Sequence, residues 1–214
     1  MTEMLPNSAD TLFQEETNPR YGAWIKNPAD KFFLYSQGYL TAANMLYASI
    51  EAEPFHQNVL VYPMIFNYRQ FLELRLKELT IMGNAFLGRE KDFRDVHSLK
   101  SLWDEYRNEI LIGISKIDKA TLDNVERLIK EFEREDPQSM NYRYPVQKLP
   151  KQGTGLASRK ESLSRDTLDL KNFKSSMDKL VHFLDWQWEL IANSQDTKNE
   201  QLAEMLSDMR ESYY

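Results

Sequence analysis

Apolar residues repeat at intervals of three and four positions over five long stretches of this chain. That spacing places them on one face of an α-helix and is typical of amphipathic helices that pack against one another. The stretches lie, in order, at about 27–52, 58–82, 98–110, 118–135 and 169–193. The pattern therefore predicts an all-α fold, an antiparallel bundle of four to five long helices.

Residues with capping side chains indicate where four of these helices begin. Asn27 opens the first helix, and Ser98 and Asp118 open the third and fourth. A side-chain oxygen at such a position accepts a hydrogen bond from a free backbone amide of the first turn. The last core helix is predicted to be capped near Asp169, and Gly83 is predicted to end the second helix.

The segments around the helices divide the chain further. Residues 1–26 are polar and interrupted by proline and glycine, so an irregular N-terminal segment is predicted. Residues 27–193 form the predicted helical domain, within which 137–166 carry too many prolines and glycines for a helix. This excursion before the last core helix is predicted to be an irregular loop or a short hairpin, since its tyrosines favour extended backbone.

Residues 194–214 are predicted to form a separate amphipathic tail helix with a narrow apolar stripe. A helix of this length is marginal on its own in water. The stripe is therefore expected to dock on the parent domain, on a second subunit or on a partner protein. The candidate partner-binding residues are Leu202, Met205, Leu206 and Met209.

Composition and charge narrow the classes of function. The chain has 214 residues, of which 42% are apolar, so it is long enough to bury a sizeable core. Its net charge of −6 argues against a surface that broadly coats nucleic acid. The absence of cysteine excludes disulfides and thiol chemistry, and it fits a reducing compartment.

Signals for export, membrane insertion and cofactors are missing from the sequence. The first residues lack the basic and apolar regions of a signal peptide, and the longest apolar run is far shorter than a bilayer span. The three histidines are scattered and form no metal-ligand pattern with carboxylates, and no glycine-rich phosphate loop is present. The sequence therefore predicts a cytoplasmic protein without metal, cofactor or membrane contact.

Three charged residues form a ladder on the second helix. Arg69, Glu73 and Lys77 are four residues apart, so they share one helical face. Helical angles place Arg69 inside the apolar arc, Glu73 at its edge and Lys77 toward solvent. Because a buried guanidinium needs an acceptor, Glu73 is expected to pair with Arg69. The ladder is then a structural ion pair, a group that binds an anion or moves a proton in a pocket, or a solvated face.

The predicted excursion is locally basic, with Tyr142 and Tyr144 among its cations. Cationic and aromatic side chains in one loop suit phosphates and stacked bases, as in proteins that bind single-stranded nucleic acid. A solvated loop in an acidic protein is the alternative. The candidate residues for binding RNA or another anion are Arg143, Lys148, Lys151, Arg159 and Lys160.

Three short motifs follow one another along the chain, and a long final helix comes after them. They are Tyr68-Arg69-x3-Glu73-Leu74-x-Leu76-Lys77, then His97-x-Leu99-x2-Leu102-Trp103, then Tyr142-Arg143-Tyr144-Pro145. In this order they resemble the HEPN-like helical proteins of prokaryotes over about residues 30–193. The resemblance implies a bundle of four to five helices, usually a homodimer, and frequent membership of toxin–antitoxin, anti-phage or RNA-processing systems.

This chain departs from the pattern of the catalytic members that it resembles. Many of them look like metal-independent ribonucleases that carry an arginine followed, after four to six residues, by a histidine. None of His56, His97 and His182 has an arginine at that spacing. The usual nuclease site is therefore not carried over to this chain.

Three functions follow from these observations. The favoured one is an atypical HEPN-like module that dimerises and binds a protein or RNA, in a bacterial defence or toxin–antitoxin type system. Its expected partners are a second copy, a protein on the C-terminal helix, and RNA. The alternative is a metal-independent ribonuclease with a composite site, in which arginines hold phosphate and His97 or Glu73 moves a proton. The third is a nucleotide or small-ligand pocket between helices. The composite site would comprise Arg69, Glu73, His97 and Arg143.

Overall fold

In a computed structural model of the chain, the structure describes residues 5–15, 17–26, 31–90, 92–114, 116–148 and 159–211. At 147–148, 159, 198–199, 201–203 and 205–211 it describes the backbone only. The chain divides into two compact units, residues 1–31 and 32–214, and each is described by itself. In the first unit, residues 5–15 and 17–26 form turns and bends without a helix or strand.

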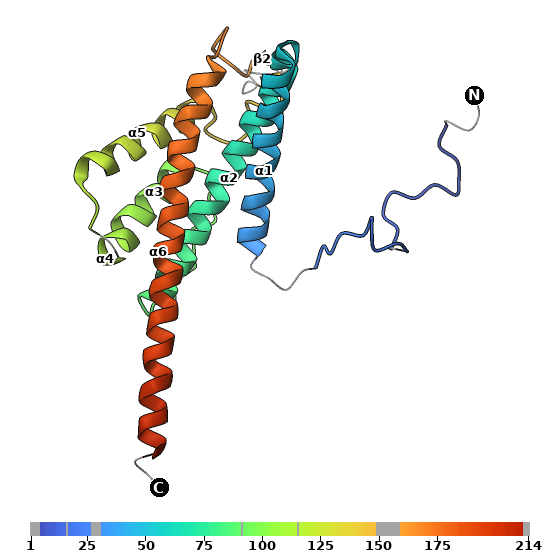
Figure 1. Cartoon of the computed structure of the whole chain (residues 1–214). Coiled ribbons are helices and arrows are strands. Elements are labelled where there is room, and N and C mark those ends of the chain that lie inside the picture. Colours follow the sequence, from blue (N-terminus) through green and yellow to red (C-terminus); the bar gives the residue numbers. More distant parts are fainter. Residues whose placement is uncertain are drawn as a thin grey trace, which may run out of the picture. The chain divides into compact units, whose positions relative to one another are not determined.

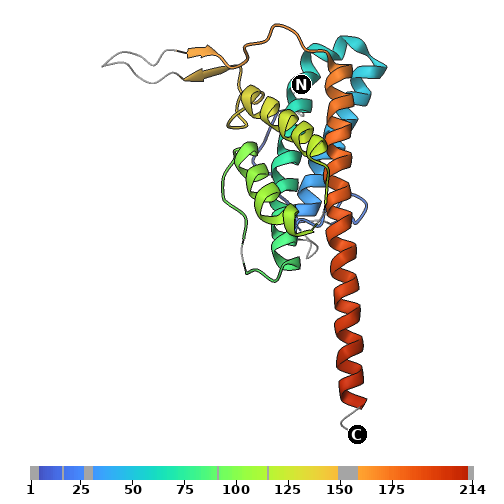
Figure 2. The same ribbon diagram turned by 90° about the vertical axis from the view of Figure 1, so that its left-hand side faces the viewer.

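The second unit is an all-α bundle with one small hairpin, as predicted (Figure 1). The hairpin pairs β1 (Val146–Lys148) with β2 (Arg159–Glu161) in antiparallel register, and Figure 2 shows it extending away from the helices. The helices are α1 (Lys31–Ala52), the 3-10 turn η2 (Pro54–His56), α2 (Gln57–Phe86), α3 (Leu99–Glu105), the π-helix η3 (Tyr106–Leu111), α4 (Ile112–Ile114), α5 (Lys119–Glu135) and α6 (Leu170–Glu211).

Capping residues begin three helices where the sequence predicted them. Ser98 accepts a hydrogen bond at 3.2 Å from the backbone amide three residues later, and Asp118 and Asp169 each do the same at 2.9 Å. These contacts satisfy amides that have no partner within the helix. The start signal predicted at 27–30 lies outside the described residues, and α1 is described from Lys31.

Two predicted helix ends are wrong. α2 continues past Gly83 to Phe86, because this glycine serves packing and not termination: a Cβ there would lie 2.0 Å from Cγ2 of Ile110. The tail predicted as a separate helix is the continuation of α6, which runs unbroken for 42 residues. Its sequence from Leu170 to Glu211 contains neither glycine nor proline, so nothing interrupts the helix.

α2 is the central helix of this unit and packs against α3, η3 and α6. Aromatic contacts join the layers: the ring centroids of Tyr68 and Phe173 are 5.7 Å apart between α2 and α6, and Phe132 of α5 lies 6.1 Å from Phe173. A helix enclosed in this way is normally apolar all round. Five buried residues of α2 are nevertheless charged: Arg69, Glu73, Arg75, Lys77 and Glu78.

Gly83→Ala is expected to lower the free energy of unfolding by about 1–3 kcal/mol, because the added methyl overlaps Ile110 in a packed core. Gly38→Ala is the matched control, since a Cβ at Gly38 meets nothing within 4 Å. There, replacing a helical glycine stabilises by up to about 1 kcal/mol. Urea unfolding followed by circular dichroism measures both, and equal effects of the two substitutions would contradict the close contact.

Candidate functional site

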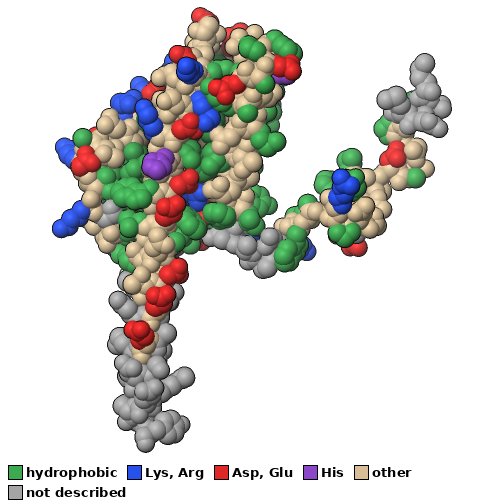
Figure 3. Space-filling model, viewed as in Figure 1, with side chains coloured by type: hydrophobic (Ala, Val, Ile, Leu, Met, Phe, Trp, Pro, Cys, Tyr) green, Lys and Arg blue, Asp and Glu red, His purple; other side chains and the backbone are tan. Residues whose placement is uncertain are grey.

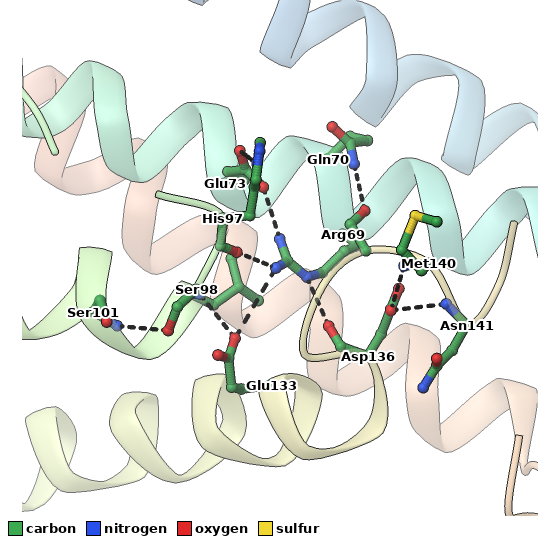
Figure 4. A network of polar contacts seen from close by, with 12 residues as sticks. Arg69, Gln70, Glu73, His97, Ser98, Ser101, Glu133, Asp136, Met140 and Asn141 are labelled. Carbon is green, nitrogen blue, oxygen red and sulfur yellow. Dashed lines mark hydrogen bonds and ion pairs between the residues drawn. The ribbon is translucent and has the colours of Figure 1, made fainter. Parts of the chain in front are cut away.

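The Arg69 side chain lies at the centre of a polar network that links α2, the start of α3 and the end of α5 (Figure 4). It is fully buried, with 0% of its side chain exposed. Nη1 donates to Glu73 Oε2 at 3.2 Å, Nη2 donates to the backbone carbonyl of His97, and Nε donates to the carbonyl of Asp136 at 3.4 Å. All three guanidinium nitrogens therefore have acceptors within the protein.

Glu73 is the acceptor that connects the ladder to the surface. Its Oε1 lies 3.0 Å from Lys77 Nζ and 2.9 Å from His97 Nδ1. Lys77 is buried, so its predicted exposure is wrong. The segment that leads to α3 covers it, with Nζ lying 5.1 Å from the centroid of the Phe93 ring. The His97 side chain, in contrast, is 73% exposed.

Two acidic residues near the end of α5 complete the network. Glu133 Oε2 lies 4.0 Å from Arg69 Nη2 and accepts the amide of Leu99 at 2.8 Å. Asp136 Oδ1 accepts the amides of Met140 and, at 3.0 Å, Asn141. The carboxylates therefore order the start of α3 and the turn after α5 around the same guanidinium.

Burial and charge act against each other on Arg69. Burial lowers the pKa of its guanidinium, and the surrounding carboxylates, that of Glu73 foremost, raise it. Because the ordinary pKa of arginine is far above neutral, the group stays charged. A charge at this depth is tolerated only when it is paired and hydrogen-bonded, as it is here.

The four residues of the predicted composite site do not form one open cleft. Arg69, Glu73 and His97 come together, whereas the contacts described for Arg143 lead elsewhere. Its guanidinium lies 5.5 Å from the ring centroid of Phe66 and 5.5 Å from that of Tyr144. Only His97 of the connected three presents its side chain to solvent. A substrate phosphate would have to displace protein acceptors to reach Arg69.

The predicted basic loop is described in part. Arg143 is exposed beside the start of the hairpin, and Lys160 is exposed on β2. The side chains of Lys148 and Arg159, and all of Lys151, lie outside the described residues. The side chains of the predicted partner-binding stripe also lie outside them, although the α6 backbone is described there: Leu202, Met205, Leu206 and Met209.

A second buried charge cluster on α2 was not predicted from the sequence. Arg75 Nη1 lies 2.8 Å from Glu78 Oε2, and its Nη2 lies 3.0 Å from Asp185 Oδ1 on α6. Glu78 Oε1 also accepts the indole N–H of Trp188 at 2.7 Å. On the helical wheel of α2, Arg75 lies at the edge of the apolar arc opposite to Arg69. The sequence of α2 alone could not indicate that Arg75 pairs with a residue of α6. The cluster fastens α2 to α6.

A cavity of about 420 Å³ lies between α5 and the first turns of α6. Its lining includes the apolar side chains of Ile65, Phe132 and Met177, with Arg127 and Arg165 among the polar ones. Arg165 is already paired with Glu135 at 2.9 Å. The residues of the composite site do not line this cavity. It lies between helices, where the third hypothesis places a small ligand.

Comparisons with known proteins add no assignment. No model of a protein family matches the chain, and neither a curated protein nor a solved structure matches it. Within the described part of the chain, no group of three metal-ligating side chains is placed to hold an ion. Across the same described residues, no helix is both long and apolar enough to cross a membrane. The function is therefore inferred from this geometry and from the sequence motifs.

Arg69→Met is expected to lower the free energy of unfolding by about 3–5 kcal/mol, because it removes one cationic partner of the buried Glu73 carboxylate and the donor of two backbone carbonyls. Arg127→Met is the matched control: Arg127 forms an ion pair with Glu131 at the same four-residue spacing, but 62% of its side chain is exposed. Breaking that pair should change stability by at most about 1 kcal/mol. Urea unfolding compares the two variants, and similar losses would contradict a structural role for Arg69.

Proposed function

We propose that this chain is an atypical HEPN-like helical protein that acts as a dimerising interaction module. In this proposal it binds a protein or RNA in a bacterial defence or toxin–antitoxin type system and has no ribonuclease activity. The resemblance in motif order supports the class, and the missing Arg-x4-6-His spacing supports the lack of the usual activity. The enclosed Arg69 network supports a structural role for the residues that carry the resemblance.

The observation that carries the interaction role is the length of α6. Its last core residue is Ile191, yet the helix continues to Glu211. Figures 1 and 2 both show this distal part running past the other helices of the unit. Side chains described there, such as Asp196 and Glu204, are exposed. An uncovered helix of this length gains little stability from its own domain, and a partner that packs on it would supply it.

The distal apolar stripe follows the core face of α6. At 100° per residue along one unbroken helix, Leu202 and Met209 fall within about 20° of Ile191. The face that packs into the bundle therefore continues, in the sequence pattern, beyond the bundle. A partner docked on the stripe would extend the same helical packing, which is the helix-in-groove mode of recognition.

One observation favours the ribonuclease alternative. An exposed imidazole whose Nδ1 lies 2.9 Å from a buried carboxylate is an arrangement that general bases use. When the neutral His97 ring carries its hydrogen on Nδ1, Nδ1 donates to Glu73. Nε2 is then the acceptor that would take a proton. Arg143 would then be the cation that meets phosphate, because Arg69 is already occupied.

Leu202→Glu/Met209→Glu is expected to remove bound partners, because it places charges on the stripe. The purified full chain is immobilised and exposed to a bacterial lysate. The protein that it retains is quantified by mass spectrometry, and the RNA by sequencing. Thr197→Glu/Ser207→Glu is the matched control, since both positions fall on the opposite side of the helix. Partners lost from the first variant and kept by the control support the proposal. If wild type retains nothing, or both variants retain the same partners, it fails.

Purified wild-type protein is expected to leave single-stranded RNA intact without added metal, at the same level as His97→Ala. The reason is that the enclosed Arg69 cannot stabilise developing charge on a phosphate. Gel analysis of a labelled RNA measures this, with His182→Ala as the control because His182 is also exposed. Cleavage by wild type and His182→Ala that His97→Ala abolishes would establish the ribonuclease alternative.

A further inference from the structure

The outward face of α1 carries no charge over most of its length. Lys31 and Glu51 are its only charged residues, in a chain with 28% charged side chains. In Figure 3 the band of α1 shows neither blue nor red side chains along its middle. Surface helices normally present charged side chains to water. The exposed face of α1 therefore has the composition of an interface.

The exposed residues along the middle of this face repeat with the spacing of a helix-pairing seam. They alternate by four and three residues, the pattern that keeps one stripe facing a second helix. Leu34 is 39% exposed and Met45 is 69% exposed. A Cβ at Gly38 would meet nothing within 4 Å, so no close contact described within this chain requires a glycine at this position. The stripe, which we call the α1 seam, is Leu34, Gly38, Thr41, Met45, Ala48 and Ala52.

We propose that the α1 seam packs antiparallel against the α1 seam of a second copy of this chain. This inference rests on the proposed function, since it names the surface through which the module dimerises. An isologous two-fold contact requires that residue i meets residue j and residue j meets residue i. The seam meets that condition in the antiparallel arrangement.

One register uses the whole seam. In an antiparallel pair of helices the residue numbers rise in opposite directions. The numbers of any two residues that face each other therefore add up to the same sum. In the register where this sum is 86, all six seam positions face one another, and no two large side chains meet. Small residues meet at the points of closest approach, where a glycine lets two backbones come near. The layers are Leu34 with Ala52, Gly38 with Ala48, and Thr41 with Met45 of the second copy.

Charge at the two ends of α1 favours the antiparallel direction. α1 is described from Lys31, and its other end carries Glu51 followed by Glu53. Antiparallel packing brings Lys31 of one copy to the acidic end of the other, whereas parallel packing would bring like charges together. Opposed helix dipoles act in the same sense.

The size of the seam sets the strength of the contact. From Leu34 to Ala52 the helix rises roughly 27 Å, and a helix is about 10–12 Å wide, so each copy offers roughly 300 Å² of projected face. Two such faces fall short of the roughly 1,200 Å² of a stable interface. Phe55 and Val59, which are 72% and 67% exposed just beyond α1, extend the apolar surface. We therefore expect a weak dimer that depends on concentration.

Cysteine cross-linking tests the register directly, because the chain contains no cysteine of its own. Gly38→Cys and Ala48→Cys are prepared as separate full-length proteins and oxidised alone and as an equal mixture. Each alone should stay largely monomeric, since the two copies of one position lie roughly 15 Å apart along the axis in this register. The mixture should give a disulfide-linked heterodimer, since the two positions face each other within bonding reach. Ile112→Cys, at a 76% exposed site on α4, is the control for random collision.

Sedimentation velocity over a concentration series gives the second readout. Met45→Glu should weaken self-association at least about tenfold while Ile112→Glu leaves it unchanged, with circular dichroism confirming that both variants fold. Self-linking of Gly38→Cys alone would show either a parallel contact or another antiparallel register, and both overturn the register proposed here. Cross-linking no better than Ile112→Cys, with sedimentation still showing a dimer, would overturn the α1 seam and leave the proposed dimerising module standing. A monomer at every concentration would overturn the dimer itself, while partner binding through α6 keeps its own test.

Discussion

The bundle is organised around the buried positive charge of Arg69. The Arg69 guanidinium collects a carboxylate from its own helix, the carbonyl of His97 before α3 and the carbonyl of Asp136 after α5. A charge removed from water is stable only with such partners, so the chain segments that supply them must come together at one point. The ends of two helices are therefore fixed relative to α2 by a polar requirement. The apolar core alone would tolerate small shifts between these helices.

The same constraint decides between the functional alternatives. An arginine that stabilises a transition state holds donors ready for charge that develops on the substrate. The donors of Arg69 are already directed at protein atoms, and freeing them would take one cation from the buried Glu73 carboxylate and leave two backbone carbonyls without their donor. That rearrangement costs several kcal/mol before any substrate is bound. This cost does not apply to His97, because its ring is exposed to solvent while its Nδ1 contacts Glu73.

Local pattern predicted the helices and the pair of Arg69 with Glu73, because both depend on spacing within one helix. It placed Lys77 in solvent because helical angles describe α2 alone and take no account of Phe93, which arrives from a later segment. Gly83 was misread because a glycine serves equally as a helix end and as a point of close approach; only Ile110 distinguishes them. The acceptors from His97 and Asp136 are backbone carbonyls, which leave no residue-type signal at all.

The stability of the single chain does not explain two residues of the α1 seam, Gly38 and Met45. An exposed glycine within a helix destabilises it by roughly 1 kcal/mol relative to alanine, and a Cβ at Gly38 would meet nothing within 4 Å that requires a glycine there. Exposed Met45 likewise adds no packing to its own core. A second helix close to α1 turns both into favourable contacts, because the glycine admits the backbone and the methionine finds a surface to cover. The features that weaken the monomer are thus the ones that suit an assembled form.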